Sequence, residues 1–219
     1  MNNTGRNKMV HALRFKWLTP FYDFIVGATT REKVFKKALI EQSRVREGQQ
    51  VLDLACGTGT LAILIKQSQP ESIVTAVDGD ESILSIAIKK TGKECVSITY
   101  DQAFSDQLPY ENHKFDLIVS SLFFHHLNWD AKQRTAKEIF RILKPGGELH
   151  IADWGCPSNS FMRIMFYLIQ MLDGFENTQD NVSGKLITLF KESGFINVSA
   201  HKSFNTVFGT LTLYSATKE

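Results

Sequence analysis

The segment Val51–Thr60 constrains the fold of this chain more than any other part of the sequence. It reads VLDLACGTGT: a nearly continuous apolar run followed by a turn that contains Gly57 and Gly59. An apolar run without alternation is typical of a parallel strand that is covered on both faces. The two glycines permit a sharp turn and let a ligand approach the backbone closely. We therefore expect a buried strand, a ligand-binding glycine turn, and then a helix over Leu61–Ser68.

Asp53 is the one charged residue in this strand. A carboxylate in a buried strand needs a partner, and a cationic ligand at the end of the strand would provide one. The spacing Gly57-x-Gly59-x-x-Ala62 also fits the dinucleotide fingerprint, but a carboxylate would repel a pyrophosphate there. A ligand that carries an ammonium group and no phosphate fits better, and S-adenosyl-L-methionine is such a ligand. We expect this cofactor to contact the following residues: Asp53, Ala55, Cys56, Gly57, Thr58 and Gly59.

A second acid ends the next predicted strand, Ile73–Asp78. Asp78 follows Asp53 by 25 residues, and a carboxylate at the tip of the second strand can accept hydrogen bonds from both ribose hydroxyls. Gly79 extends the same loop. The alternative is that Asp78 caps the following helix, although Asp80 is also placed to do so. Ribose binding does not distinguish S-adenosylmethionine from a nicotinamide dinucleotide, so a nicotinamide-dependent oxidoreductase remains the less favoured alternative.

The overall composition excludes several other classes of protein. A chain of 219 residues is long enough for one domain with its own core. A formal net charge of +2 does not indicate a nucleic-acid partner. Three cysteines far apart in the sequence predict no disulfide framework. Neither a signal-peptide pattern nor an apolar run of about 20 residues is present. We expect a cytoplasmic protein with a small-molecule substrate and no transmembrane segment.

Helices and strands alternate along the rest of the chain. The pattern predicts a doubly wound, mostly parallel α/β sheet whose last two strands form an antiparallel hairpin, because so short a link cannot join parallel strands. We expect the helix that follows Asp78 to end at Gly92. The predicted helices are Glu81–Lys90, Asp130–Leu143, Ser158–Asp173 and Ser183–Ser193, and the predicted strands are Cys95–Tyr100, Phe115–Ser121, Glu148–Asp153, Ile196–Ser203 and Thr206–Thr217.

Four motifs occur in a fixed order: VLDLACGTG, TAVDGD, FDLIVSSLFFHHL and ILKPGGELHIADW. Together they resemble the class I S-adenosylmethionine-dependent methyltransferases, and most of all the branch of quinone-biosynthesis C-methyltransferases. The resemblance covers roughly residues 20 to 217. It implies a Rossmann-like sheet of seven strands, with the last strand inserted antiparallel beside the fifth. It also implies methyl transfer to a small, apolar or aromatic molecule; a non-catalytic binding protein of the same fold is the alternative.

The chain departs from this branch ahead of Leu108-Pro109. Its members usually place an acid there that reaches the adenine amino group, whereas this chain has Phe104. We expect adenine to contact the ring of Phe104 and the backbone amide of Ser105 or Asp106. Asp101 is the less favoured alternative. Ser120, at the end of the fourth strand, is a further predicted cofactor contact.

The predicted catalytic residues are His125, His126, Asp153 and Tyr22. Adjacent histidines point in different directions, so at most one faces the substrate as a general base; the alternative is that both only shape the loop. With no third ligand at a useful spacing, we expect no metal site. Asp153 would orient a substrate group, or else cap a helix or shape a loop. By the resemblance, Tyr22 belongs to a lid over the cofactor, with simple aromatic packing as the alternative.

We expect a single methyltransferase domain over 1–219 that includes two lid segments: residues 1–30 at the N-terminus, and residues 155–182 on the substrate side. Phe161–Leu172 is apolar almost all round, which suits a helix with one side in the core and the other on an apolar substrate or on a second subunit of a homodimer. Core packing alone is the alternative. Arg6–Leu18 is basic and amphipathic, so it either closes over the domain or contacts an anionic membrane peripherally.

Overall fold

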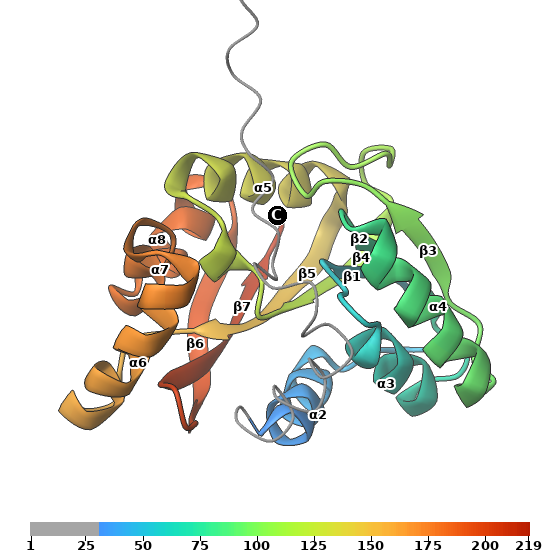
Figure 1. Cartoon of the computed structure of the whole chain (residues 1–219). Coiled ribbons are helices and arrows are strands. Elements are labelled where there is room, and N and C mark those ends of the chain that lie inside the picture. Colours follow the sequence, from blue (N-terminus) through green and yellow to red (C-terminus); the bar gives the residue numbers. More distant parts are fainter. Residues whose placement is uncertain (1–30) are drawn as a thin grey trace, which may run out of the picture.

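The computed structural model describes residues 31–219 and contains one sheet of seven strands (Figure 1). The predictions for Tyr22 and for the segment 1–30 lie outside the described residues. The strand order is β3-β2-β1-β4-β5-β7-β6, which confirms the predicted α/β class. The strands are β1 Gln50–Leu54, β2 Ile73–Asp78, β3 Thr99–Gln102, β4 Phe115–Ser121, β5 Leu143–Trp154, β6 Ile196–Asn205 and β7 Thr210–Thr217.

The last strand in the sequence lies inside the sheet. Strands β1 to β5 pair in parallel, whereas β7 pairs antiparallel with β5 on one side and with β6 on the other. Both the hairpin and the antiparallel insertion beside the fifth strand are thereby confirmed. The carboxyl ends of the five parallel strands meet at one edge, where ligands bind in open α/β sheets.

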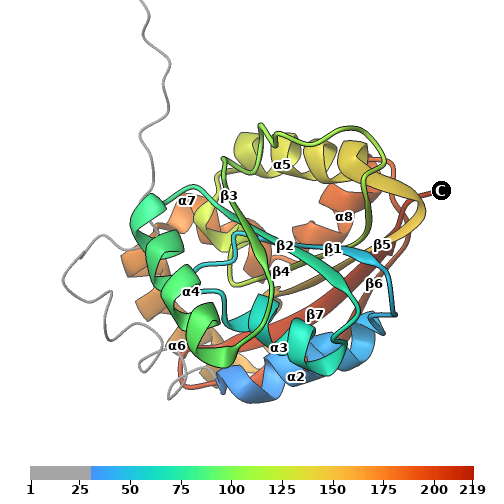
Figure 2. The same cartoon turned by 90° about the vertical axis from the view of Figure 1, so that its right-hand side faces the viewer.

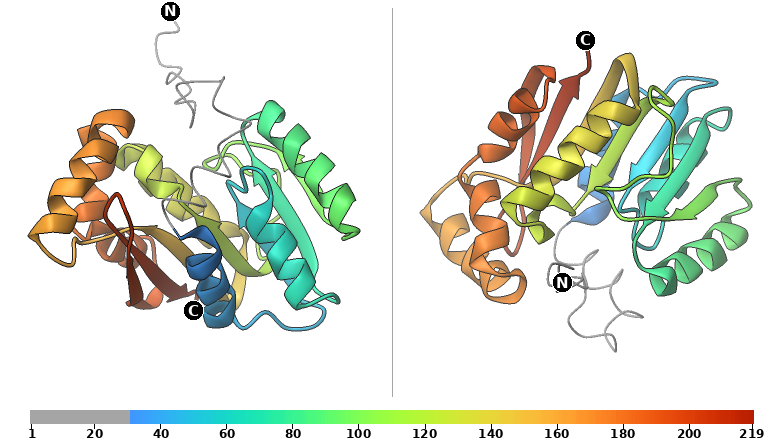
Figure 3. Two further views of the ribbon diagram at one scale, coloured as in Figure 1. Left: turned by 60° about the horizontal axis from the view of Figure 1, so that its bottom comes forward. Right: turned by 90° about the horizontal axis from the view of Figure 1, so that it is seen from above.

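Helices cover both faces of the sheet (Figure 2). Helices α2, α3 and α4 lie on one face, and α5 and α8 lie on the other. The remaining helices, α6 and α7, pack together beside the hairpin (Figure 3). Within the described part of the chain no helix is long and apolar enough to cross a membrane. The helices are α2 Glu32–Ser43, α3 Thr60–Ser68, α4 Glu81–Glu94, η2 Phe124–His126 (a short 3-10 helix), α5 Trp129–Ile142, α6 Ser160–Asp173, α7 Phe175–Val182 and α8 Lys185–Glu192.

The apolar run in β1 follows directly from this layered arrangement. Leu52 and Leu54 pack with α5 and α8 on one face, and Val51 packs with α2 and α3 on the other. Since successive side chains of a strand point to opposite faces, a strand covered on both faces needs apolar residues at nearly every position. Asp53 is the exception, and it is buried as deeply as its neighbours.

Several predicted boundaries were wrong. Helix α4 continues past Gly92 to Glu94 and ends where Cys95 takes a left-handed backbone conformation with φ 54°. A glycine inside a helix costs only about 1 kcal/mol, which packing can offset. Strand β3 consequently begins at Thr99 rather than at Cys95. Strand β5 begins at Leu143 rather than at Glu148, and β7 begins at Thr210 rather than at Thr206.

Candidate functional site

The glycine turn after β1 forms the first wall of the site. Ala55, Gly57 and Gly59 all have positive φ angles, of 56°, 54° and 75°. A Cβ atom added at Gly57 would meet nothing within 4 Å, so this part of the backbone faces open space. One added at Gly59 would lie 2.7 Å from the hydroxyl of Tyr100. Gly57 therefore leaves room for a ligand, whereas Gly59 allows the turn to pack closely against its neighbours.

Asp78 connects this turn to the loop after β2. Its carboxylate accepts hydrogen bonds from the backbone N–H of Gly57 at 2.9 Å and from that of Asp80 at 3.0 Å. Asp80 caps α4, since its side chain accepts from the N–H of Ser82 at 2.9 Å. Burial raises the pKa of Asp78. The capping role thus belongs to Asp80, and Asp78 stands between the two loops that would hold a ribose.

Asp53 lies beneath the glycine turn. One carboxylate oxygen, Oδ2, accepts from the N–H of Ala62 at 3.0 Å, while Oδ1 is buried without a hydrogen-bond partner among residues 31–219. Burial raises the pKa of Asp53 to about 7, against the opposing charge of Lys36. Lys36 itself is paired with Glu32 at 2.5 Å. A buried acceptor left without a hydrogen bond is costly, and a cationic ligand at this turn would stabilise it.

The remaining predicted cofactor contacts differ in how accessible their side chains are to a ligand. Phe104 is 54% exposed, and a Cβ atom at Gly79 would lie 3.1 Å from its ring. The ring therefore stands exposed beside the loop after β2. Asp101 accepts a hydrogen bond from the hydroxyl of Tyr110 at 2.9 Å.

Four other predicted contacts are tied to the framework. The hydroxyl of Ser105 bonds that of Thr135 at 2.8 Å, and the buried Ser120 donates to the carbonyl of Leu54 at 2.8 Å. The N–H of Cys56 donates to the carbonyl of Val77 at 3.0 Å and so fixes the turn against β2. Thr58 is buried within the turn. Each of these residues therefore helps to hold the framework of the site together.

A cluster of two histidines and two acids lies between the ends of β4 and β5; we call His125, His126, Asp153 and Asp173 the histidine–aspartate cluster. Nδ1 of His125 is 2.7 Å from Oδ1 of the fully buried Asp153. The carboxylate of Asp153 also accepts from the N–H groups of Phe123, Phe124 and Trp154 and from the side chain of Asn181. Burial would raise the pKa of Asp153, but His125, together with the N–H of Trp154, holds it below its ordinary value. Asp153 therefore positions His125 and has no free oxygen directed at a substrate.

The fourth member of the cluster comes from a distant part of the chain. Asp173, the last residue of α6, lies 3.8 Å from Nε2 of His125 and 3.6 Å from Nδ1 of His126. No third ligand lies at a useful spacing in the sequence, yet the side chain of Asp173 converges with those of both histidines in the fold. Asp173 is 47 residues from His126 in the sequence, so spacing could not reveal it. One local signal was present: Asp173 is an acid in the last turn of a helix, where its negative charge interacts unfavourably with the helix dipole.

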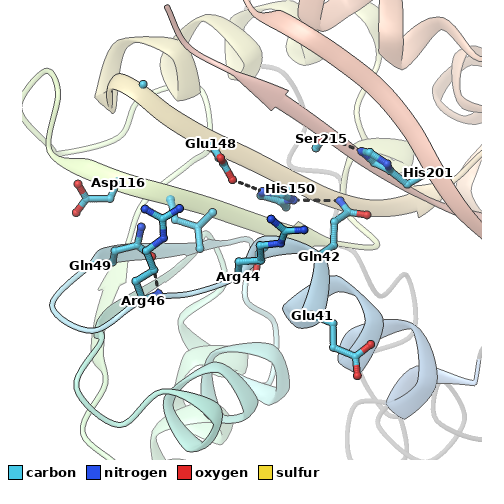
Figure 4. Close-up of a pocket in the computed structure, with 13 residues that line it drawn as sticks. Glu41, Gln42, Arg44, Arg46, Gln49, Asp116, Glu148, His150, His201 and Ser215 are labelled. Carbon is cyan, nitrogen blue, oxygen red and sulfur yellow. Dashed lines mark hydrogen bonds and ion pairs between the residues drawn. The ribbon is translucent and has the colours of Figure 1, made fainter.

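Another cavity lies at the opposite edge of the sheet (Figure 4). It has a volume of about 460 Å³ and is formed by the end of α2 and the starts of β4 and β5. Its polar side chains bond one another: Gln42 and Glu148 both contact the ring of His150 at 3.0 Å. None of the predicted site residues lines this cavity. The glycine turn and the histidine–aspartate cluster at the carboxyl edge are therefore the candidate site.

Comparisons with known proteins identify related methyltransferases. Residues 51–147 match the family described as a methyltransferase domain. The ubiquinone/menaquinone biosynthesis C-methyltransferase of Blochmanniella floridana is 34% identical over 62% of this chain and 54% of its own length. This chain thus spans about half of that relative. The demethylmenaquinone methyltransferase of Staphylococcus aureus (strain JH9) is 28% identical over 90% of this chain and 89% of its own length.

A solved structure shows the same fold. The phosphoethanolamine N-methyltransferase 2 of Haemonchus contortus, in complex with phosphomonomethylethanolamine and S-adenosylhomocysteine, superposes with a TM-score of 0.69. It is 18% identical in sequence, and the match covers 91% of this chain and 56% of that chain. At this identity the likeness concerns the fold alone.

Proposed function

We propose that this chain is a class I S-adenosylmethionine-dependent methyltransferase whose methyl acceptor is a small apolar or aromatic molecule, a proposal supported by the methyltransferase family match and the related methyltransferases. The bound cofactor supplies an activated methyl group on a sulfonium. The protein must then hold the methyl group and the acceptor in line and exclude water.

The cofactor is proposed to bind across the two loops after β1 and β2. Asp53 would neutralise the ammonium group, and Asp78 would accept hydrogen bonds from the ribose hydroxyls. The backbone of the glycine turn and of Gly79 would lie along the cofactor, with the ring of Phe104 against adenine and the backbone of Ser105 beside it. The buried Oδ1 atom of Asp53 without a partner in the described residues supports this arrangement.

The exposed apolar face of α6 is the observation that carries the choice of acceptor. This helix follows the carboxyl end of β5, so it begins at the same edge of the sheet as the cofactor loops. An apolar face left exposed marks a binding surface for an apolar partner. The relatives named above act on quinones by their names, which makes an alkylated hydroquinone the first acceptor to test. The exposed large apolar side chains of α6 are Phe161, Ile164, Tyr167, Leu168, Met171 and Leu172.

We assign to His126 the role of general base for the nucleophilic group of the methyl acceptor. Its side chain is 15% exposed, against 5% for His125, whose Nδ1 is occupied by Asp153. We propose that His126 accepts the acceptor's proton, while His125 and Asp153 position the loop that carries it. Burial and the neighbouring His125 lower the pKa of His126 well below its ordinary value.

The test is turnover by the full chain with S-adenosylmethionine and a panel of acceptors. We expect S-adenosylhomocysteine and a methylated product, identified by mass spectrometry, from alkylated hydroquinones and phenols but not from polar amines. Cofactor binding without turnover on any acceptor fraction would favour the non-catalytic alternative. Tighter binding of a nicotinamide dinucleotide than of S-adenosylmethionine would favour the oxidoreductase.

Gly57→Val serves as the negative control and is itself a prediction. Valine there must adopt a positive φ angle and would fill the space that faces the ligand. We expect cofactor binding, measured by calorimetry with S-adenosylhomocysteine, to be lost while circular dichroism stays near wild type. Retained affinity in the folded variant would move the cofactor site away from this turn.

A further inference from the structure

Three side chains of the histidine–aspartate cluster present metal-ligating atoms to one another. Nitrogen atoms of His125 and His126 and the carboxylate of Asp173 all lie within 4.8 Å of one another. The carboxylate is 3.8 Å from one ring and 3.6 Å from the other. Two ligands of a tetrahedral Zn²⁺ ion lie about 3.4 Å apart, given Zn–N and Zn–O bonds near 2 Å. Small side-chain movements would therefore complete a coordination sphere.

We propose that His125, His126 and Asp173 bind one divalent transition-metal ion of the Zn²⁺ type. Two imidazoles and one carboxylate are a donor set for Zn²⁺, Co²⁺ or Fe²⁺, whereas Mg²⁺ and Ca²⁺ prefer oxygen ligands. Three protein ligands leave a coordination position open, unlike the closed four-ligand sites of structural zinc.

Asp153 is the second observation that points to a metal ion. A metal-binding histidine usually donates its other N–H to a carboxylate, which fixes the tautomer and the direction of the ring. Nδ1 of His125 makes this bond to Asp153 at 2.7 Å, which leaves Nε2 as the nitrogen nearest Asp173. Asp153 is itself held by three backbone N–H groups and by Asn181. The first ligand is thus oriented by a rigid outer layer before any ion arrives.

The ion would join two elements that are far apart in the sequence. His125 and His126 belong to η2 after β4, and Asp173 is the last residue of α6. An ion on Nδ1 of His126 would leave a proton on the other ring nitrogen, which could then no longer accept one. Metal binding and proton acceptance by His126 exclude each other, so the ion inhibits methyl transfer. This consequence rests on the proposed function, whereas the binding of the ion does not.

The experiment titrates Co²⁺ into the chelator-treated full chain and follows the visible absorption of the ion; Zn²⁺ then displaces it. We expect one ion per chain. Asp173→Asn and His126→Gln should each weaken Co²⁺ binding at least tenfold. Asp153→Asn should weaken it roughly 10- to 100-fold, as is typical when the hydrogen-bond partner of a metal ligand is changed. The matched control is His201→Gln, since His201 lies on β6 and bonds Ser215; its affinity should equal that of the wild type.

Thermal unfolding gives a second readout that does not depend on activity. Zn²⁺ should raise the Tm of the wild type and of His201→Gln but not that of Asp173→Asn. Absence of one-to-one binding, or equal affinity in folded Asp173→Asn and wild type, overturns the site. If the ion binds as expected but leaves turnover unchanged, the metal site stands and the assignment of His126 as proton acceptor fails.

Discussion

The carboxylate of Asp78 accepts hydrogen bonds from both cofactor loops, through Gly57 and Asp80. Asp78→Ala removes this link and the proposed ribose contacts. At about 1.5–3 kcal/mol for each hydrogen bond to a charged group, we expect the Kd for S-adenosylhomocysteine to rise more than tenfold. Calorimetry measures the change. Asp80→Asn is the matched control, because asparagine caps a helix as well as aspartate does. Equal affinity of Asp78→Ala and wild type would exclude a ribose contact.

Phe104 is a second residue whose contribution to cofactor affinity can be measured. It is exposed rather than buried in the sheet, so its ring is available to a ligand. Partial contact of an aromatic ring is worth about 1–2 kcal/mol, and Phe104→Ala should lose that much cofactor affinity. Phe104→Asp should lose less, because an acid can reach the adenine amino group. Phe161→Ala, which removes an exposed ring from α6, should leave cofactor affinity unchanged. An alanine variant that binds like the wild type would place adenine elsewhere.

Some residues of the site could be predicted from the sequence and others could not. Asp53 and Asp78 stand out because each is a charge at an otherwise apolar strand position. Asp173 does not, because it approaches His126 only after α6 folds back beside the end of β4. The bond between Ser120 and the carbonyl of Leu54 was equally hidden, since it joins neighbouring strands that are 66 residues apart.

At the scale of elements, helix α6 has two apolar faces with different surroundings. Phe166 is buried against Trp154, with ring centroids 5.4 Å apart, whereas Leu168 is 49% exposed. Phe166→Ala should lower the free energy of unfolding by about 3–5 kcal/mol, as measured by urea denaturation. Leu168→Ser should change it by less than about 0.5 kcal/mol and should raise KM for the apolar acceptor. An unchanged KM would remove this face from the substrate site.

Helix α7 shows where a hydrophobic pattern fails as a guide. The side of α7 that is buried is mostly polar: Thr178, Asp180 and Asn181 point inward. The ammonium group of the buried Lys132 donates to the carbonyl of Asn177 at 2.5 Å and lies 3.7 Å from Asp180. Periodicity of apolar residues predicts helices that pack through apolar faces. A short helix held by polar contacts has no such signal, and no helix was predicted there.

At the scale of the whole molecule, Asp53 makes stability depend on pH. Its pKa rises from 3.8 to about 7 in the folded chain, so between these values the folded state keeps a proton that the unfolded state has released. The free energy of unfolding of the cofactor-free chain should therefore fall as the pH rises from about 4 to about 7, by a few kcal/mol. Urea denaturation of wild type and Asp53→Asn across this range isolates the contribution of Asp53.

The asparagine variant, which carries no titrating group at this position, should lack this fall. Asp106→Asn is the control, because Asp106 forms a partly exposed ion pair with Arg134 and should leave the pH dependence of the wild type in place. Parallel profiles for wild type and Asp53→Asn would mean that Lys36 keeps Asp53 ionised throughout. The doubly wound, mostly parallel sheet was predictable from the alternation of elements, and the place of its last strand from the family resemblance. The depth of Asp53 was not, since burial of a charge depends on what packs over it.

The place of β7 between β5 and β6 has a consequence for how the chain is made. A ribosome synthesises β6 before β7, yet β6 pairs only with β7 within the described sheet. Until residues 210–217 have emerged, β5 has an open edge and β6 has no partner strand. An unpaired strand edge can join another chain, which is a common route to aggregation. Completion of this sheet during synthesis thus waits for β7, and ribosome-bound chains that stop before residue 210 should expose that edge.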